Sequence, residues 1–335
     1  MNKTIILFSL LVIAFSCNKQ TKKSFQKNNT INFTNDSFNT VSRLNSEELK
    51  KISDSILVSY RIKIDKNYIY LNEIKSNKFL NIIKLPEEDF IGAFGNKGKG
   101  PCETIVAWDI DKSDSGTLLI LDPKQKKVVE FNVDSLINKK ACANEYKLND
   151  KSYYHKVLKK KNKLYYTDEN NREYRFFESD LNGENIKGHG IIQTNITFKN
   201  PRKNLTGNIN NVFMVNHENL FVFGYYYYPL IELFDIETKE WKSIVGPTNE
   251  IPDDNFKQGN FIYSSTRITN KYIYALYAGK SDSIDVNIIF VFNLKGEPIK
   301  KLILDKGIFN FDVYNDKYIY GLNFADSNIL KFKID

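Results

Sequence analysis

The chain has 335 residues, of which 41% are hydrophobic and 26% are charged, and its formal net charge is +8. This apolar fraction is typical of globular proteins and excludes wholesale disorder, while 16 Gly and 8 Pro exclude collagen-like and Pro-rich architectures. Three Cys cannot build a disulfide framework, and three His with two Met supply few ligands for soft metals. The 24 Phe and 20 Tyr favour β-structure.

The N-terminus has the pattern of a secretory signal. A lysine at position 3 precedes the apolar residues 4–15, and Ser16 stands before Cys17. The apolar run is shorter than the roughly 20 residues that cross a bilayer, and a membrane anchor helix is the alternative interpretation. Residues 14–17 resemble the lipobox of bacterial lipoproteins, in which the cysteine is acylated and becomes the new N-terminus, although Phe15 replaces a small residue.

This resemblance implies a signal peptide over residues 1–16 and a Cys17 that carries fatty acyl chains such as palmitate. The polar composition of the following residues predicts a flexible tether over residues 17–45. Asn18 is not the Asp of inner-membrane retention signals, which favours the outer membrane. We therefore expect a lipoprotein of the bacterial cell envelope, on the periplasmic side or at the cell surface.

Residues 46–52 are the best helical candidate, with Ser46 as the N-cap. Most of the remaining chain consists of short alternating segments bounded by Asn, Asp, Gly and Lys, which is the pattern of β-strands. One unit, an alternating strand followed by a polar turn and an aromatic strand, recurs six times. Its anchor positions are Ile69, Leu119, Tyr165, Phe221, Ile273 and Ile319.

Units of about 50 residues with four antiparallel strands are typical of β-propeller blades. We predict an all-β, six-bladed propeller over residues 46–335; a pair of β-sandwiches and a β-solenoid are the alternatives. The sixth unit ends after its third strand, at Asp335. Because an open strand edge promotes aggregation, an N-terminal strand should close the ring, drawn from residues 31–33 or 56–58.

A resemblance to the repeat of NHL-type propellers begins at Gly92. It covers the segment from Gly92 to Glu103 and the strands that follow, as far as Phe131. This segment is more similar to the TolB-like six-bladed propeller lipoproteins, which carry a Gly-x-Gly-Pro-Gly-Glu element between their early blades. Cys102 stands where that element has its last Gly. The resemblance implies the propeller fold and implies no particular activity.

In a propeller of this connectivity, the second-to-third strand loops and the connections between blades share one face. The Gly-rich loop on that face contains Lys97, Lys99 and Glu103. Its backbone amides, freed by glycine, could hold an anion, with Lys97 and Lys99 supplying positive charge; a turn between blades is the alternative. The four tyrosines at 225–228 are the second feature, and packing between blades is their alternative role. The candidate binding residues are Lys97, Lys99, Glu103, Asp122, Arg172, Tyr225, Tyr226, Tyr228 and Arg267.

The sequence contains no recognisable arrangement of catalytic residues, and we expect neither a cofactor nor a set of metal ligands. The preferred function is a non-catalytic binding or scaffold module for a glycan, peptide or protein, attached to the membrane by its lipid. The alternative is a metal-dependent, lactonase-like hydrolase that uses channel carboxylates such as Asp122 and Asp312. The lysine clusters are scattered, so we expect no nucleic-acid partner, and we expect a monomer. Because a complete propeller core needs no staple, we expect Cys102 and Cys142 to remain unbridged.

Overall fold

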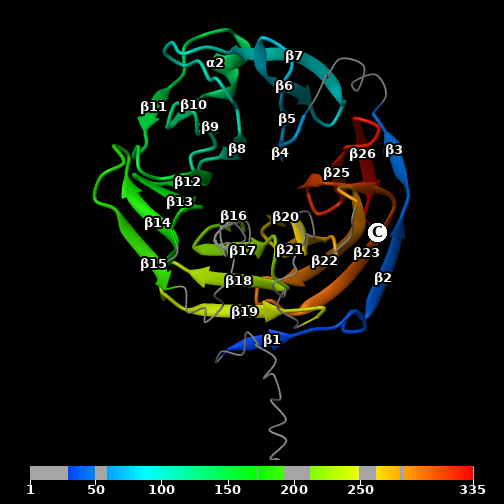
Figure 1. Cartoon of the computed structure of the whole chain (residues 1–335). Helices are drawn as coiled ribbons and strands as arrows, with labels where there is room; N and C mark the ends of the chain where they lie inside the picture. Colours follow the sequence, from blue (N-terminus) through cyan, green and yellow to red (C-terminus); the bar gives the residue numbers. More distant parts are fainter. Residues whose placement is uncertain are drawn as a thin grey trace, which may run out of the picture.

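The computed structural model describes residues 29–49, 59–171, 173–191, 212–248, 262–279 and 283–334. Six sheets stand around a central axis and form a six-bladed β-propeller, as predicted (Figure 1). In each blade, four strands run antiparallel from the axis to the rim, and the blades are numbered here in the order of their inner strands. Among the described residues, no helix is long and apolar enough to cross a bilayer.

The strands of the first three blades have the following bounds. Blade 1 contains β4 (Ile62–Ile64), β5 (Tyr68–Asn72), β6 (Lys78–Lys84) and β7 (Asp89–Asn96). Blade 2 contains β8 (Asp109–Lys112), β9 (Leu118–Asp122), β10 (Lys127–Phe131) and β11 (Asn144–Lys147), with the short helix α2 (Val133–Ile137) after β10. Blade 3 contains β12 (Tyr154–Lys160), β13 (Lys163–Asp168), β14 (Tyr174–Asp180) and β15 (Lys187–Ile191).

The other three blades each include a strand from the N-terminal segment. Blade 4 contains β16 (Val212–His217), β17 (Leu220–Tyr225), β18 (Leu230–Asp235) and β19 (Trp241–Val245), with β1 (Thr30–Asn32) outside them. Blade 5 contains β20 (Tyr263–Ile268), β21 (Tyr272–Tyr277), β22 (Val286–Asn293) and β23 (Pro298–Ile308), with β2 (Thr40–Leu44) outside them. Blade 6 contains β24 (Asn310–Tyr314), β25 (Tyr318–Asn323), β26 (Asn328–Lys333) and β3 (Ser46–Glu48).

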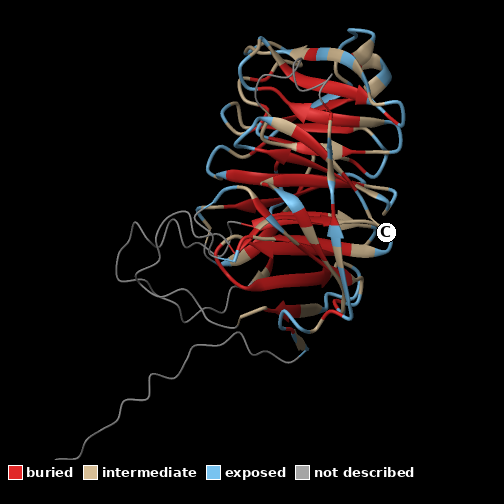
Figure 2. Ribbon diagram, turned by 90° about the vertical axis from the view of Figure 1, so that its right-hand side faces the viewer, coloured by how far each residue is buried: buried red, intermediate tan, exposed pale blue. Residues whose placement is uncertain are grey.

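The middle strands are buried on both faces because each blade packs between two neighbours (Figure 2). In β5, Ile69 and Leu71 pack against blade 6, and Tyr70, on the opposite face, packs against blade 2. Full burial of one such side chain contributes about 1.5–3 kcal/mol. These strands therefore combine alternating geometry with apolar residues on both faces, which is the pattern that identified the repeats.

An N-terminal strand closes the ring, as predicted, but it comes from another segment. Residues Ser46–Glu48, expected to begin a helix, form β3 and pair antiparallel with β26. The open edge of β26 supplies hydrogen-bond partners that outweigh the local helical pattern, and the Leu49 amide continues the ladder to the carbonyl of Ile329 at 3.0 Å. The segment 31–33 contributes to β1 in blade 4, and residues 56–58 lie outside the described residues.

The predicted tether over residues 17–45 is too long. Strand β1 pairs parallel with β19, and β2 pairs parallel with β23. Between them, Phe33 and Phe38 are buried against Phe290 and Phe292, with ring centroids 4.9–5.8 Å apart. Burial of two phenylalanines holds this polar segment on the propeller, which a composition average does not reveal. The folded domain thus begins before residue 46, and Cys17 lies outside the described residues.

Candidate functional site

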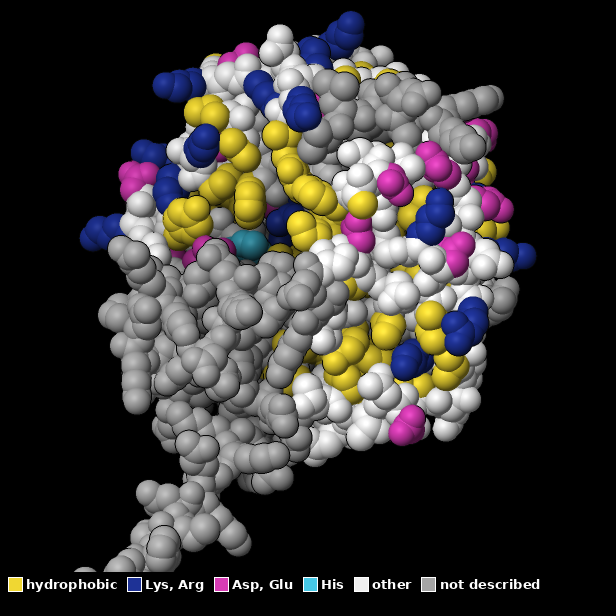
Figure 3. Space-filling model, turned by 45° about the vertical axis from the view of Figure 1, so that its right-hand side comes forward, with side chains coloured by type: hydrophobic (Ala, Val, Ile, Leu, Met, Phe, Trp, Pro, Cys, Tyr) yellow, Lys and Arg dark blue, Asp and Glu magenta, His cyan; other side chains and the backbone are white. Residues whose placement is uncertain are grey.

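The candidate site lies on the face where the inner strands β4, β8, β12, β16, β20 and β24 begin, here called the mouth face. Because strands alternate in direction, the loops after β9, β13, β17 and β25 reach this same face, as predicted. Large apolar side chains that stay exposed gather in its loops and strand beginnings. They are Ile74, Trp108, Tyr153, Ile284 and Phe324. Figure 3 shows such hydrophobic side chains beside a histidine and charged groups.

Five side chains from four blades form a cluster at the channel opening, here called the mouth cluster: Arg61, Trp108, His155, Phe213 and Tyr226. The Trp108 and His155 rings lie 6.0 Å apart, and the His155 and Tyr226 rings lie 5.9 Å apart. Tyr226 also packs on Phe213 at 4.4 Å, and the Arg61 guanidinium lies 5.3 Å from the Trp108 ring centre. The cluster combines aromatic surface with a cation.

Below the mouth cluster, charged side chains from three inner strands neutralise one another. The Lys156 ammonium lies 2.7 Å from carboxylate oxygens of both Asp109 and Asp111. Lys63 reaches Asp111 at 2.8 Å. Burial by itself would raise the pKa of Asp111, but the ammonium groups of Lys156 and Lys63 outweigh it and hold that pKa well below its usual value. These groups are therefore structural ion pairs as well as the floor of the mouth.

Arg267, a predicted binding residue, belongs to this filled channel. Its side chain is buried, donates to the Asn310 side-chain oxygen at 2.8 Å and lies 3.6 Å from Asp312. The hollow that remains among Arg61, Asp109, Lys156 and Arg267 measures about 10 Å³, roughly the space of one water molecule. This hollow is too small for a ligand larger than water, so the mouth cluster above it is the candidate contact surface.

Of the tyrosines at 225–228, only Tyr226 reaches the mouth. Tyr225 and Tyr228 are buried between blades, which corrects their assignment as binding residues and agrees with the alternative of packing. The Tyr225 hydroxyl donates to Glu232 at 2.5 Å and accepts from Arg175 at 3.1 Å. The strand β17 ends at Tyr225 and the chain then bends, so the four tyrosines do not form one extended segment.

The Gly-rich loop is filled by its own carboxylate. The Gly100 amide donates to Glu103 Oε2 at 2.9 Å, and a Cβ on Gly98 would stand 2.0 Å from the same oxygen. Lys97 donates to the Ile74 carbonyl, and Lys99 is exposed at the tip. The loop is therefore a turn between blades and not an anion cradle. Cys102 has φ of 60°, the left-handed conformation that explains Gly at this place in the resembling element.

The carboxylates proposed for a hydrolase are engaged elsewhere. Asp122 is fully buried and accepts from the amides of Ile105 and Lys124. Asp312 accepts from the Ile64 amide at 2.8 Å and faces Arg267. Within the described ranges, no group of three or more His, Cys, Asp and Glu side chains could hold a metal ion. Arg172 lies outside those ranges.

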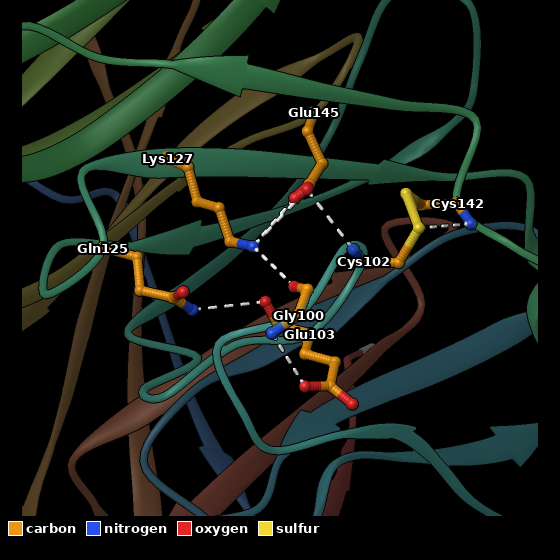
Figure 4. The surroundings of a disulfide bond; sticks show 7 residues. All are labelled: Gly100, Cys102, Glu103, Gln125, Lys127, Cys142 and Glu145. Atoms are coloured by element: carbon orange, nitrogen blue, oxygen red, sulfur yellow. Dashed lines mark hydrogen bonds and ion pairs between the residues drawn. A yellow bond between two sulfur atoms is a disulfide. The ribbon is translucent and has the colours of Figure 1, made fainter.

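The structure contains a disulfide between Cys102 and Cys142, so the expectation of free thiols was wrong (Figure 4). The blade-to-blade loop passes beside the segment that follows α2, which brings residues 40 positions apart to a Cα–Cα distance of 5.4 Å. Contacts of Glu145 also join the Cys102 loop to strands β10 and β11. Glu145 accepts from the Cys102 amide at 3.3 Å and pairs with Lys127 at 2.8 Å.

We expect titration of the unfolded, unreduced protein with a thiol reagent to detect no thiol from Cys102 or Cys142. The variant Cys102→Ser/Cys142→Ser should lose about 2–4 kcal/mol of unfolding free energy, because the bridge restricts the unfolded chain. Urea denaturation of both proteins measures this loss. Two reactive thiols in the unreduced wild type would contradict the bridge.

Sequence reasoning missed Arg61, Trp108, His155 and Phe213. They stand at or next to the first residue of four successive inner strands. Superposing the repeats on these strand beginnings would have placed them around one opening, whereas each residue by itself has no distinguishing pattern.

Comparison with known proteins agrees with this geometry. The model of the family described as TolB-like 6-blade propeller-like matches residues 36–316. Among solved structures, the chain is similar to a member of the DUF4221 family from Bacteroides vulgatus, with 13% identity, a TM-score of 0.59 and coverage of 88% of this chain and 96% of that chain. A putative exported protein from Bacteroides fragilis matches with 12% identity, a TM-score of 0.56 and coverage of 91% and 99%.

Virginiamycin B lyase from Staphylococcus aureus matches with 13% identity, a TM-score of 0.50 and coverage of 87% of this chain and 99% of that chain. No curated protein matches the chain in sequence. At such low identities, the solved structures establish a shared fold and carry no statement about activity.

Proposed function

Because this chain belongs to the TolB-like family of six-bladed propellers, we propose that it is a non-catalytic binding module of the bacterial cell envelope. The mouth cluster is the contact surface, and its ligand is a glycan, a peptide or a partner protein. The exported protein from Bacteroides fragilis supports the location, the lipobox-like residues 14–17 support a lipid anchor, and Asn18 after Cys17 favours the outer membrane.

One observation carries the proposal: the exposed Trp108 ring and the half-buried Tyr226 ring lie in one cluster above a floor that is closed by ion pairs. Trp108 is 40% exposed although its ring contacts His155 and Arg61. Aromatic and arginine side chains provide much of the binding energy at recognition sites. The hydrolase alternative lacks such support, because Asp122 and Asp312 are occupied by backbone amides and by Arg267.

The test compares the wild type with Trp108→Ala/Tyr226→Ala on a glycan array and in a pull-down from envelope extract. Removal of two contact rings should weaken binding by about 2 kcal/mol or more, which is at least roughly thirtyfold. The control is Ile186→Ala, which removes a side chain of similar exposure (44%) between β14 and β15, on the opposite face. If the double variant binds as tightly as the wild type, the mouth cluster is not the binding surface.

The lipid anchor has its own test. Cys17→Ser removes the thiol that would be acylated, so labelling of cells with a clickable fatty acid should no longer mark the protein. Ser16→Ala is the matched control, because it keeps both the thiol and a small residue before it. Undiminished labelling of Cys17→Ser would exclude lipidation at this residue, whatever the outcome for the mouth cluster.

A further inference from the structure

A second hollow, here called the rim pocket, lies at the outer edge of the ring. Its volume is about 480 Å³, within the range of about 300–1,000 Å³ typical of small-molecule sites. One wall is β7, and the other is α2 with the segment after it, which stand side by side at the rim (Figure 1). The inner strands, where the mouth cluster begins, do not contribute to it.

The inner lining of the rim pocket is apolar. The rings of Phe94 and Phe131 and the Leu136 side chain form it, and each is less than 10% exposed. Ala93 on β7 borders the pocket and remains exposed. Ala93 is thus a position at which a larger side chain would enter the pocket border. This lining can bury a hydrocarbon chain or ring.

The polar lining of the rim pocket is predominantly cationic. Lys78, Lys139 and Lys140 border it, against one carboxylate, that of Glu103. The Lys78 ammonium donates to Asn96 at 2.6 Å. In the part of the chain that the structure describes, no carboxylate pairs with Lys139 or Lys140. Glu103 is turned to its own loop, where one oxygen accepts from the Gly100 amide. An anionic group is therefore the complementary partner.

A disulfide links the loop after β7 to the segment after α2. Cys102 and Pro101 belong to the loop beside β7, and the bridge joins Cys102 to Cys142, two residues after Lys140 (Figure 4). The Cys142 amide also lies 3.0 Å from Cys102 Sγ. A site whose walls are already joined loses less conformational entropy when a ligand binds.

We propose that the rim pocket binds a medium-chain carboxylate. The carboxylate lies between the lysines, and the alkyl chain lies on the Phe94, Phe131 and Leu136 lining. This binding is separate from the mouth cluster and does not depend on the proposed function, because the two sites share no residue.

Isothermal titration calorimetry of the purified protein with decanoate tests the proposal. We expect one decanoate per chain and, for Lys139→Ala/Lys140→Ala, at least roughly tenfold weaker binding, because charge-assisted hydrogen bonds are lost. The control Lys66→Ala/Lys317→Ala removes the same charge from two exposed lysines in turns of blades 1 and 6 and should bind as the wild type does. Ala93→Glu, which places a carboxylate at the entrance, should also weaken binding at least tenfold.

Two further probes define the ligand class. Acetate, with the same head and no chain, should bind much more weakly, and decyltrimethylammonium, with the same chain and the opposite charge, should not bind. Three outcomes would each overturn the proposal. Decanoate does not bind, acetate or the cation binds as tightly as decanoate, or the control double variant loses as much affinity as Lys139→Ala/Lys140→Ala. Circular dichroism of each variant verifies that it is folded.

Discussion

Replacing Lys156 by Met is expected to lower the free energy of unfolding by about 3–5 kcal/mol at pH 7. The ammonium lies 2.7 Å from both Asp109 and Asp111, and all three side chains are at most 11% exposed. Its removal leaves Asp111 with the Lys63 ammonium at 2.8 Å and Asp109 with only the more distant Arg61 guanidinium, at 4.0 Å. The single cation removed therefore affects two anions.

The predicted loss depends on pH. In the wild type, the pKa of Asp111 is held low in the folded state, so its stabilising contribution is present above the pKa of an unfolded aspartate, about 3.9, and decreases as the pH falls through that value. Without Lys156, protonation of Asp111 removes a buried charge that has lost one of its two ammonium partners. The difference between wild type and Lys156→Met should consequently be largest above about pH 4 and shrink as the pH falls towards 3.

Urea denaturation at pH 7 and at pH 3 measures this effect. The control is Lys84→Met, which removes a half-exposed ion pair with Glu87 at 3.5 Å and should change the unfolding free energy by about 0–1 kcal/mol. A loss in Lys156→Met no larger than that of the control would mean that the channel ion pairs contribute little.

Replacing Arg175 by Met is expected to lower the free energy of unfolding by about 3–5 kcal/mol. Arg175 belongs to a network of side chains at the interface of blades 3 and 4. The guanidinium lies 2.8 Å from Glu232, and both side chains are at most 5% exposed. The guanidinium also lies 5.4 Å from the Trp241 ring centre. Without it, Glu232 retains the Tyr225 hydroxyl as a donor but has no cation.

A second substitution separates charge from packing. In the Arg175→Met background, Glu232→Gln should recover part of the lost stability, because a buried amide needs no counter-ion. Lys163→Met is the control, since Lys163 is 52% exposed in its pair with Glu178. If Glu232→Gln destabilises the Arg175→Met protein further, the effect is one of packing and not of an unpaired charge.

Periodicity predicted the architecture because every blade repeats one physical requirement. A middle strand such as β9, Leu118–Asp122, must be apolar on both faces to pack between neighbours, and its turns must be polar. The same periodicity assigned the loops to one face, because antiparallel strands alternate in direction. Length and pattern were sufficient for these inferences, and no contact between distant residues was needed.

Contacts between distant segments decided the remaining features. Ser46–Glu48 has a local helical pattern, yet the unpaired edge of β26 makes it a strand. The polar residues 30–44 remain on the propeller through two buried phenylalanines, and Cys102 and Cys142, 40 positions apart, are brought together by the packing of blade 2. The mouth cluster likewise takes its side chains from four blades. Local sequence determines the blade, whereas closure, the bridge and the site depend on free energies gained only when blades pack together.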